Sequence, residues 1–164
     1  MRHKGFTLVE VLITVALFSV LVAVVFSMYF VGTKTFTIAA DQSFAQKYAR
    51  TAADFISKEL RTAKDISADA GKFSGQDYYI LQLKDKDGQR YLVKTTRTAS
   101  GQTSDAFIVP LNQIAFSANN SNMVNINVTA SDGRDYDINF SIRLENISAV
   151  SIQQGSAVIY YSIY

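Results

Sequence analysis

Residues 6–32 read FTLVEVLITVALFSVLVAVVFSMYFVG, an almost unbroken apolar run that decides the fold of the chain. The run holds one charged residue, Glu10, and no proline. As an α-helix rising ~1.5 Å per residue it spans roughly 40 Å, more than the hydrocarbon core of a bilayer at about 30 Å. We therefore predict that this segment forms a helix that crosses a membrane.

The charges at the two ends of this run predict its orientation. Arg2 and Lys4 precede it, and Lys34 is the only basic residue just after it. Basic residues collect on the cytoplasmic side of a span, so we expect a single-pass protein of the cytoplasmic membrane with its N-terminus in the cytoplasm. A secretory signal peptide cleaved near Val22 is the alternative. The length of the run and the presence of Glu10 within it argue against that alternative.

The helical pattern continues beyond the membrane segment. Between Lys34 and Lys64 the sequence has no glycine or proline, and apolar residues recur every three to four positions, the spacing of an amphipathic helix. They are Phe44, Tyr48, Ala52, Phe55, Ile56, Leu60 and Ala63. We expect one helix from Phe6 to about Lys64, on the order of 90 Å long. Its outer half is expected to pack an apolar stripe on the chain's own domain rather than on a partner alone.

Strand patterns fill the rest of the chain, after a polar connection at residues 65–76. Apolar and polar residues alternate in four stretches, residues 79–84, 90–96, 124–129 and 136–143. Asp-Gly turns join them in pairs, at residues 85–88 and 131–134, whereas residues 98–105 read as a polar loop and residues 156–164 as a last strand. We predict an α+β fold in which an antiparallel sheet is covered on one face by the outer half of the helix.

The composition argues against an enzyme. There is no cysteine and one histidine, His3, so the folded part lacks the residues for a thiol nucleophile, a histidine-dependent triad or a zinc site. The carboxylates are dispersed, and residues 85–88 read as a hairpin turn rather than as a calcium loop. We therefore expect no catalytic, metal-binding or cofactor-binding residues.

The charge balance argues against nucleic acid as a partner. Of the 16 basic side chains, Arg2 and Lys4 lie before Phe6, and the remaining 14 match the 14 acidic ones. A body without net charge has no overall field to attract a phosphate backbone.

Residues 1–10 read MRHKGFTLVE and combine a short basic leader ending in Gly5, an aromatic residue, Phe6, and an acidic residue four positions later, Glu10. This pattern, followed by a membrane-length helix, resembles the signal of type IV prepilins and type II secretion pseudopilins. The resemblance implies the pilin fold, cleavage between Gly5 and Phe6 by a prepilin peptidase, and N-methylation of Phe6. It also implies assembly with other pilin subunits, by an inner-membrane assembly platform, into an extracytoplasmic or cell-surface filament. Phe6 and Glu10 are then the assembly residues.

The resemblance and the patterns together divide the chain into four parts. We expect a leader peptide at residues 1–5, a membrane-spanning and filament-core helix at 6–33, its amphipathic continuation at 34–64, and the antiparallel sheet domain at 65–164. Beyond about Phe30 the resemblance depends on this architecture rather than on a sequence motif.

Glu10 is the residue of the apolar run that we expect to carry function. A carboxylate in an apolar helix costs roughly 2.5 to 3.5 kcal/mol at the centre of a membrane and less near the interface. Cleavage creates an α-amino group on Phe6, and the amine of one subunit can pair with Glu10 of its neighbour. The alternative is that Glu10 reaches back to the cytoplasmic interface.

The kind of subunit is predicted from departures from the major pilins. Many major pilins have a proline partway along the membrane helix, where this chain has Ser27, and a pair of cysteines, which this chain lacks. Residues 113–146, which end in IRLEN at 142–146, resemble the meander of J-type minor pseudopilins and W-type minor pilins. We therefore predict a minor pilin or pseudopilin. The alternatives are an adhesin-like or DNA-uptake competence pilin, and a single-pass membrane-anchored enzyme or sensor.

Overall fold

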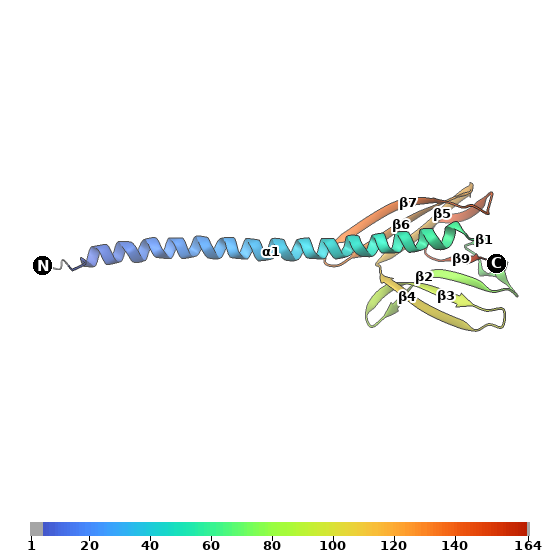
Figure 1. The fold of residues 1–164 in the computed structure, drawn as a ribbon, viewed down its shortest axis with the longest axis horizontal. Coiled ribbons are helices and arrows are strands. Elements are labelled where there is room, and N and C mark those ends of the chain that lie inside the picture. Colours follow the sequence, from blue (N-terminus) through green and yellow to red (C-terminus); the bar gives the residue numbers. More distant parts are fainter. Residues whose placement is uncertain (1–4, 164) are drawn as a thin grey trace. The chain divides into compact units, whose positions relative to one another are not determined.

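The computed structural model describes residues 5–163, apart from the side chain of Asn120. A single helix, α1, runs from Leu8 to Arg61 without interruption, which confirms the prediction of one continuous helix (Figure 1). The chain divides after Ala40 into two compact units. The first contains the beginning of α1, and the second, Asp41–Tyr164, contains the rest of α1 and the strands.

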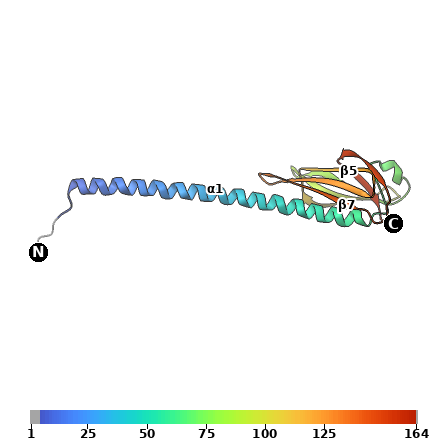
Figure 2. The ribbon, with the colours of Figure 1, turned by 90° about the horizontal axis from the view of Figure 1, so that it is seen from above.

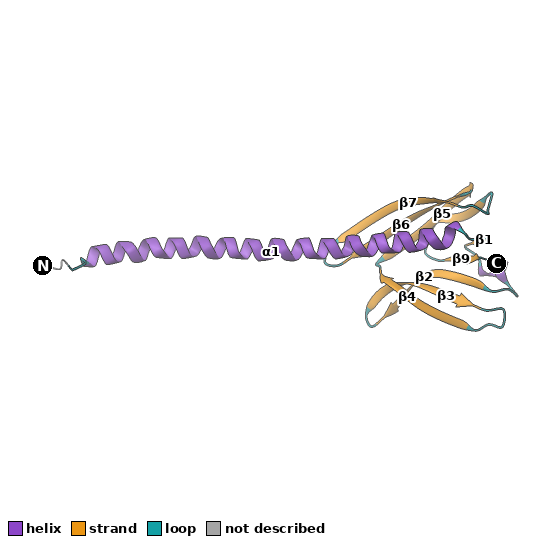
Figure 3. Ribbon diagram, viewed as in Figure 1, coloured by secondary structure: helices purple, strands orange, loops and turns teal. Residues whose placement is uncertain are grey.

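Nine strands and a short 3-10 helix, η1, follow α1 in the described part of the chain (Figure 3). They are β1 (Asp65–Ser67), η1 (Ala70–Phe73), β2 (Tyr78–Lys86), β3 (Gln89–Arg97), β4 (Thr103–Pro110), β5 (Gln113–Ser121), β6 (Met123–Ser131), β7 (Asp135–Arg143), β8 (Val150–Ser156) and β9 (Ile159–Ser162). The strands form two antiparallel sheets, one of five strands in the order β1-β9-β2-β3-β4 and one of four in the order β7-β6-β5-β8.

Two hairpins have the register that the alternating sequence predicts. In the five-stranded sheet, Lys86 of β2 pairs with Gln89 of β3 across Asp87 and Gly88, whose φ angles are 53° and 78°. Two successive residues with positive φ form a type I′ turn, which the Asp-Gly pair favours. In the four-stranded sheet, the β6-β7 hairpin closes across the second predicted turn, at residues 131–134.

The structure corrects the prediction of one sheet and of a loop at residues 98–105. There are two sheets, and residues 103–105 belong to strand β4. β4 is an edge strand whose first five residues, Thr103–Phe107, are all exposed. Because no residue of this stretch is buried, its sequence does not alternate between apolar and polar residues. The prediction also omits edge strand β8, in which only Val150 and Ile152 are buried in alternation before a polar stretch begins.

The part of α1 in the second unit runs along one face of both sheets (Figure 2). Its fully buried residues are Ala45, Ala49, Ala52, Ile56 and Leu60. This confirms that the outer half of the helix packs on the chain's own domain. The buried stripe begins with alanines, whose small side chains let the strands lie close to the helix, whereas Phe44 of the predicted stripe stays 48% exposed.

The five-stranded sheet has a second, smaller core on its other face. Phe73 of η1 and Tyr78 and Ile80 of β2 are buried there, and Val158 and Tyr160 pack against them. The short helix η1 therefore covers part of a face that the alternating pattern predicted to be open to solvent.

A polar network fixes α1 to the five-stranded sheet. Oε2 of Glu59 accepts hydrogen bonds from Nζ of Lys94 on β3, at 2.7 Å, and from the hydroxyl of Tyr161 on β9, at 2.6 Å. Nζ of Lys94 also lies 4.4 Å from the centroid of the Tyr79 ring. Burial, and then the bond to Glu59, raise the pKa of the Tyr161 phenol, so the hydroxyl remains a donor.

Candidate processing and assembly site

The N-terminal end of α1 is capped. Thr7 precedes the first helical residue, Leu8, and its Oγ1 accepts a hydrogen bond from the backbone N–H of Glu10 at 3.3 Å. The carbonyl of Thr7 accepts the first bond of the helix, from the N–H of Val11 at 3.2 Å. Thr7 is therefore the N-cap residue of α1.

Sequence reasoning overlooked the role of Thr7. The signal was present, because residues 7–10, TLVE, have the S/T-x-x-E form of a capping box directly before an apolar run. The prediction counted the helix from Phe6 instead.

The two predicted processing residues, Gly5 and Phe6, lie outside the helix. Phe6 is 80% exposed, and a Cβ added at Gly5 would meet no described atom within 4 Å. The peptide bond between them therefore lies in open, non-helical backbone. The other leader residues, Met1–Lys4, lie outside the described residues.

Glu10 lies in the first turn of α1, as its third residue. The helix start at Leu8 places the carboxylate closer to the helix end than the prediction did. This position matters because the first turn carries the positive end of the helix dipole, which stabilises an anion by about 0.3–1 kcal/mol. The helix itself thus offsets part of the cost of a carboxylate in an apolar segment. The pairing of Glu10 with Phe6 involves two chains and stays a prediction.

The first part of α1 is long and apolar enough to cross a membrane, and its side chains are not buried within the protein. Two of its hydroxyl groups have partners within the helix. Thr14 donates to the carbonyl of Val11 at 2.8 Å, and Ser19 donates to the carbonyl of Ala16 at 2.7 Å. Polar groups that find partners inside their own helix are compatible with a lipid environment.

A family model described as the prokaryotic N-terminal methylation motif matches residues 1–26. The chain carries a prepilin-type signal. The methylation motif includes Gly5, Phe6, Thr7 and Glu10, the residues brought together at the start of α1. Beyond the motif, one long helix packed on antiparallel sheets is a pilin-like architecture. No curated protein and no solved structure matches the chain.

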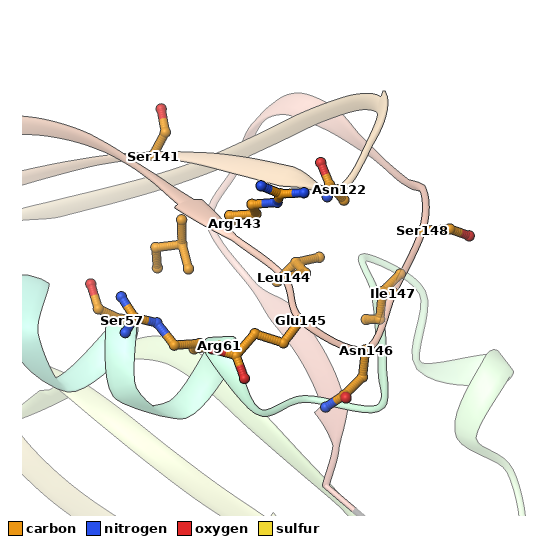
Figure 4. A pocket seen from close by; sticks show the side chains of 11 residues that line it. Ser57, Arg61, Asn122, Ser141, Arg143, Leu144, Glu145, Asn146, Ile147 and Ser148 are labelled. Atoms are coloured by element: carbon orange, nitrogen blue, oxygen red, sulfur yellow. The ribbon is translucent and has the colours of Figure 1, made fainter.

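At the other end of α1, the segment after β7 closes over the last turn (Figure 4). The N–H of Glu145 donates to the carbonyl of Arg61 at 3.4 Å, and the side-chain amide of Asn146 donates to the carbonyl of Thr62 at 3.3 Å. Leu144, which is 2% exposed, anchors this segment in the core. The segment thus supplies donors to carbonyls that the end of a helix leaves without partners.

A cavity of about 750 Å³ lies beside this C-terminal cap. Its charged lining residues are Arg61, Arg143 and Glu145. In Figure 4 the guanidinium group of Arg61 lies beside Ser57, whereas that of Arg143 points toward Asn122, so the two cations do not converge. The cavity therefore lacks the geometry of an anion-binding site.

Within residues 5–163, no three histidine, cysteine or carboxylate side chains lie close enough together to hold a metal ion. Asp105 of β4 has a structural role in the sheet, since it accepts a hydrogen bond from Lys84 of β2 at 2.6 Å and another from Thr95 of β3. These hydrogen bonds lower the pKa of Asp105. The contacts tie three strands together and point to no reaction.

Proposed function

We propose that the chain is a minor pilin or pseudopilin, a structural subunit of a type IV pilus or of a type II secretion pseudopilus. The proposal rests on two properties of the N-terminal segment. Residues 1–26 match the methylation motif, and the first part of the helix that they begin is apolar and unburied. Such a helix needs a cover from lipid or from other helices. The membrane supplies the first cover, and neighbouring subunits of a filament supply the second.

Processing comes first in this proposal. The chain inserts in the cytoplasmic membrane with its N-terminus in the cytoplasm, a prepilin peptidase cleaves between Gly5 and Phe6, and Phe6 is N-methylated. An inner-membrane assembly platform then adds the subunit to an extracytoplasmic or cell-surface filament. The open backbone at the Gly5-Phe6 bond supports this order, because a peptidase can reach the bond before helix packing covers the segment.

Assembly depends on Glu10 in this proposal. The α-amino group that cleavage creates on Phe6 of one subunit lies against the Glu10 carboxylate of a neighbour. At ~4 Å and an effective dielectric constant near 20, such a pair attracts by about 4 kcal/mol before the cost of desolvating both groups is subtracted. The pair would set the axial register between adjacent helices.

Two substitutions at Glu10 test this role. Glu10→Leu removes the charge and the carboxylate oxygens, whereas Glu10→Gln removes the charge but keeps a side chain that suits a capping box. Both variants are expected to insert in the membrane, to be cleaved after Gly5, and to be absent from sheared filaments. Intact-mass analysis and immunoblots of cell and filament fractions measure these outcomes. Either variant entering filaments at the wild-type level would refute the pairing.

The minor-subunit part of the proposal has its own test. It is supported by Ser27 in place of a helix proline and by the absence of cysteine. Mass spectrometry of sheared filaments is expected to find this subunit far below the most abundant one. Parity between the two would identify a major subunit instead.

One observation favours an adhesin-like role as the second candidate. Strands β5, β6 and β8, which are neighbours in the four-stranded sheet, contain no charged residue. Three amides on the outer face of this sheet are held in place. Asn127 Nδ2 donates to Asn139 Oδ1, and Ser141 Oγ donates to Asn125 Oδ1, both at 2.6 Å. The part of this face that β5, β6 and β8 form has donors and acceptors but no charged side chain, which suits an uncharged, hydroxyl-rich polymer such as a polysaccharide.

Binding of the full-length chain, in detergent, to dextran-coated beads tests this second candidate. Ser117 lines two hollows without charged lining residues on this face, of about 440 and 500 Å³, so Ser117→Lys is expected to fill them and abolish retention. Ser104→Lys on exposed strand β4 is the matched control and is expected to bind like the wild type. Equal retention of the two variants, or no retention of the wild type, would remove the candidate.

A further inference from the structure

We infer that Thr7 is a positioning residue for processing, because its side chain fixes where α1 begins and thereby keeps the Gly5-Phe6 bond out of the helix. The inference rests on the proposed cleavage at that bond. Two independent observations meet at this residue: the capping hydrogen bond from Glu10 to Thr7, and the methylation motif that spans residues 1–26.

A peptide bond within an α-helix is poorly placed for a peptidase. Its carbonyl is engaged by the N–H four residues further on, and the helix must unwind before the carbonyl can be attacked. If α1 began one turn earlier, the Gly5 carbonyl would accept a hydrogen bond from the N–H of Val9. In the structure, residues 5–7 are non-helical and the carbonyl of Thr7 accepts a bond at the start of the helix.

The cap determines where α1 begins because the segment starts a helix that crosses an apolar environment in this proposal. An unpaired backbone N–H is costly in an apolar environment, so a helix end without a cap either extends or frays. Oγ1 of Thr7 takes the N–H of Glu10 and satisfies the end at this position. Phe6 and Thr7 thus separate the scissile bond from the first helical residue.

The same cap would serve the mature subunit. After cleavage only Phe6 precedes Thr7, so the helix can no longer recruit leader residues to satisfy its first N–H groups. Thr7 then holds the end of the helix directly beside the new amine. The cap therefore fixes the position of that amine relative to Glu10 in every subunit.

Thr7→Val tests the inference with a small change, since valine keeps the β-branched shape and removes the hydroxyl acceptor. Thr7→Ser restores an acceptor. Thr14→Val is the matched control, because the Thr14 hydroxyl donates to carbonyls within the helix and caps no N–H. Full-length chains in membrane vesicles are incubated with a prepilin peptidase, and the loss of residues 1–5 is followed by intact mass.

Cleavage of Thr7→Val is expected to be about fivefold slower than that of the wild type, the rate ratio that corresponds to ~1 kcal/mol for a lost N-cap. Thr7→Ser and Thr14→Val are expected to be cleaved at the wild-type rate. Hydrogen exchange of the Glu10 amide, measured by NMR in micelles, should slow in Thr7→Val, because the N–H of Glu10 would bond to the Phe6 carbonyl in a helix that extends toward Gly5, and it should return to the wild-type rate in Thr7→Ser.

Faster exchange in Thr7→Val would overturn the inference, because the helix end would then fray rather than extend over the bond. Slower exchange together with wild-type cleavage would overturn it too, because the cap would then not control access to the bond. Slow cleavage of Thr7→Ser would overturn it as well, since an acceptor at this position would not suffice. A wild-type chain that is not cut after Gly5 would instead remove the proposed processing, and this inference with it.

Discussion

Replacing Tyr161 with phenylalanine isolates one hydrogen bond between α1 and the five-stranded sheet. Tyr161 is fully buried, and its hydroxyl donates to Glu59 Oε2 at 2.6 Å. Phenylalanine keeps the ring beside Tyr79, and Glu59 keeps its second partner, Lys94 at 2.7 Å. A hydrogen bond to a charged group contributes about 1.5–3 kcal/mol. We therefore expect Tyr161→Phe to lower the free energy of unfolding by about 2 kcal/mol at pH 8.

The size of this difference is expected to depend on pH in a defined direction. Burial and the bond to Glu59 raise the pKa of Tyr161 above its usual value near 10. Above pH 10 the unfolded chain releases this proton while the folded chain keeps it, so the folded state loses about 1.4 kcal/mol of stability per pH unit. The variant has no proton to release at this position. The difference in free energy of unfolding between the wild type and Tyr161→Phe should therefore shrink from about 2 kcal/mol at pH 8 to under about 1 kcal/mol at pH 11.

Urea denaturation of a fragment that starts at Lys34, at pH 8 and at pH 11, measures both effects. Tyr136→Phe is the control, because Tyr136 is half-buried on β7 in the other sheet. Its substitution is not expected to reproduce the pH-dependent difference. A Tyr161→Phe deficit below about half a kcal/mol at pH 8, the usual size for surface substitutions, would refute the reasoning. So would a deficit that stays constant between the two pH values.

Three further substitutions probe other parts of the chain. Gly5→Val should leave residues 1–5 attached, because the prepilin peptidase that the resemblance implies requires a small residue before the cut. A wild-type mature chain found by intact mass to start anywhere other than Phe6 would contradict the proposed processing. Leu60→Ala removes a fully buried side chain and should lower the free energy of unfolding of the same fragment by about 2–5 kcal/mol, and a loss below about half a kcal/mol would show that this position is not core. Gly133→Ala should cost at least about 1 kcal/mol, because φ there is 78° and a Cβ would lie 2.9 Å from Oδ2 of Asp41; unchanged stability in urea would show that the β6-β7 turn does not pack on α1 as described.

The long helix could be predicted from the sequence because its signals are local and repeated many times. The apolar run at residues 6–32 and the three-to-four spacing that follows it exclude most other structures. The start of the helix depends on one hydroxyl group, that of Thr7. A boundary that depends on a single side chain is easily missed beside a pattern that extends over dozens of residues.

The pairing of the strands could not be predicted, because alternation shows which residues face a core and not which strands are neighbours. β9 follows β8 in the sequence but lies between β1 and β2 in the other sheet. Its place depends on contacts between distant residues, such as the pairing of Tyr79 with Tyr161. The exposed edge strand β4 gave no alternating pattern at all over its first five residues.

The processing residues Gly5 and Phe6 and the assembly residue Glu10 could be proposed because the resemblance supplied their roles and the sequence supplied their spacing. The structure adds that Gly5 and Phe6 lie outside the helix and that Glu10 lies in its first turn. The proposed salt bridge joins two subunits, so the fold of one chain cannot create it. The filament experiments on Glu10 variants are therefore the direct test of the assembly role.

Residues 142–146, IRLEN, show how a sequence resemblance can follow from a structural need. Leu144 is buried, and the Glu145 N–H and the Asn146 amide donate to carbonyls at the end of α1. Any chain that packs the end of a long helix under a β-meander has to satisfy those carbonyls, and an asparagine after the strand can do so. The motif is therefore expected wherever this arrangement occurs, in minor and major subunits alike. The minor-subunit proposal accordingly gains its support from Ser27 and from the absence of cysteine, and its test is the count of subunits in sheared filaments.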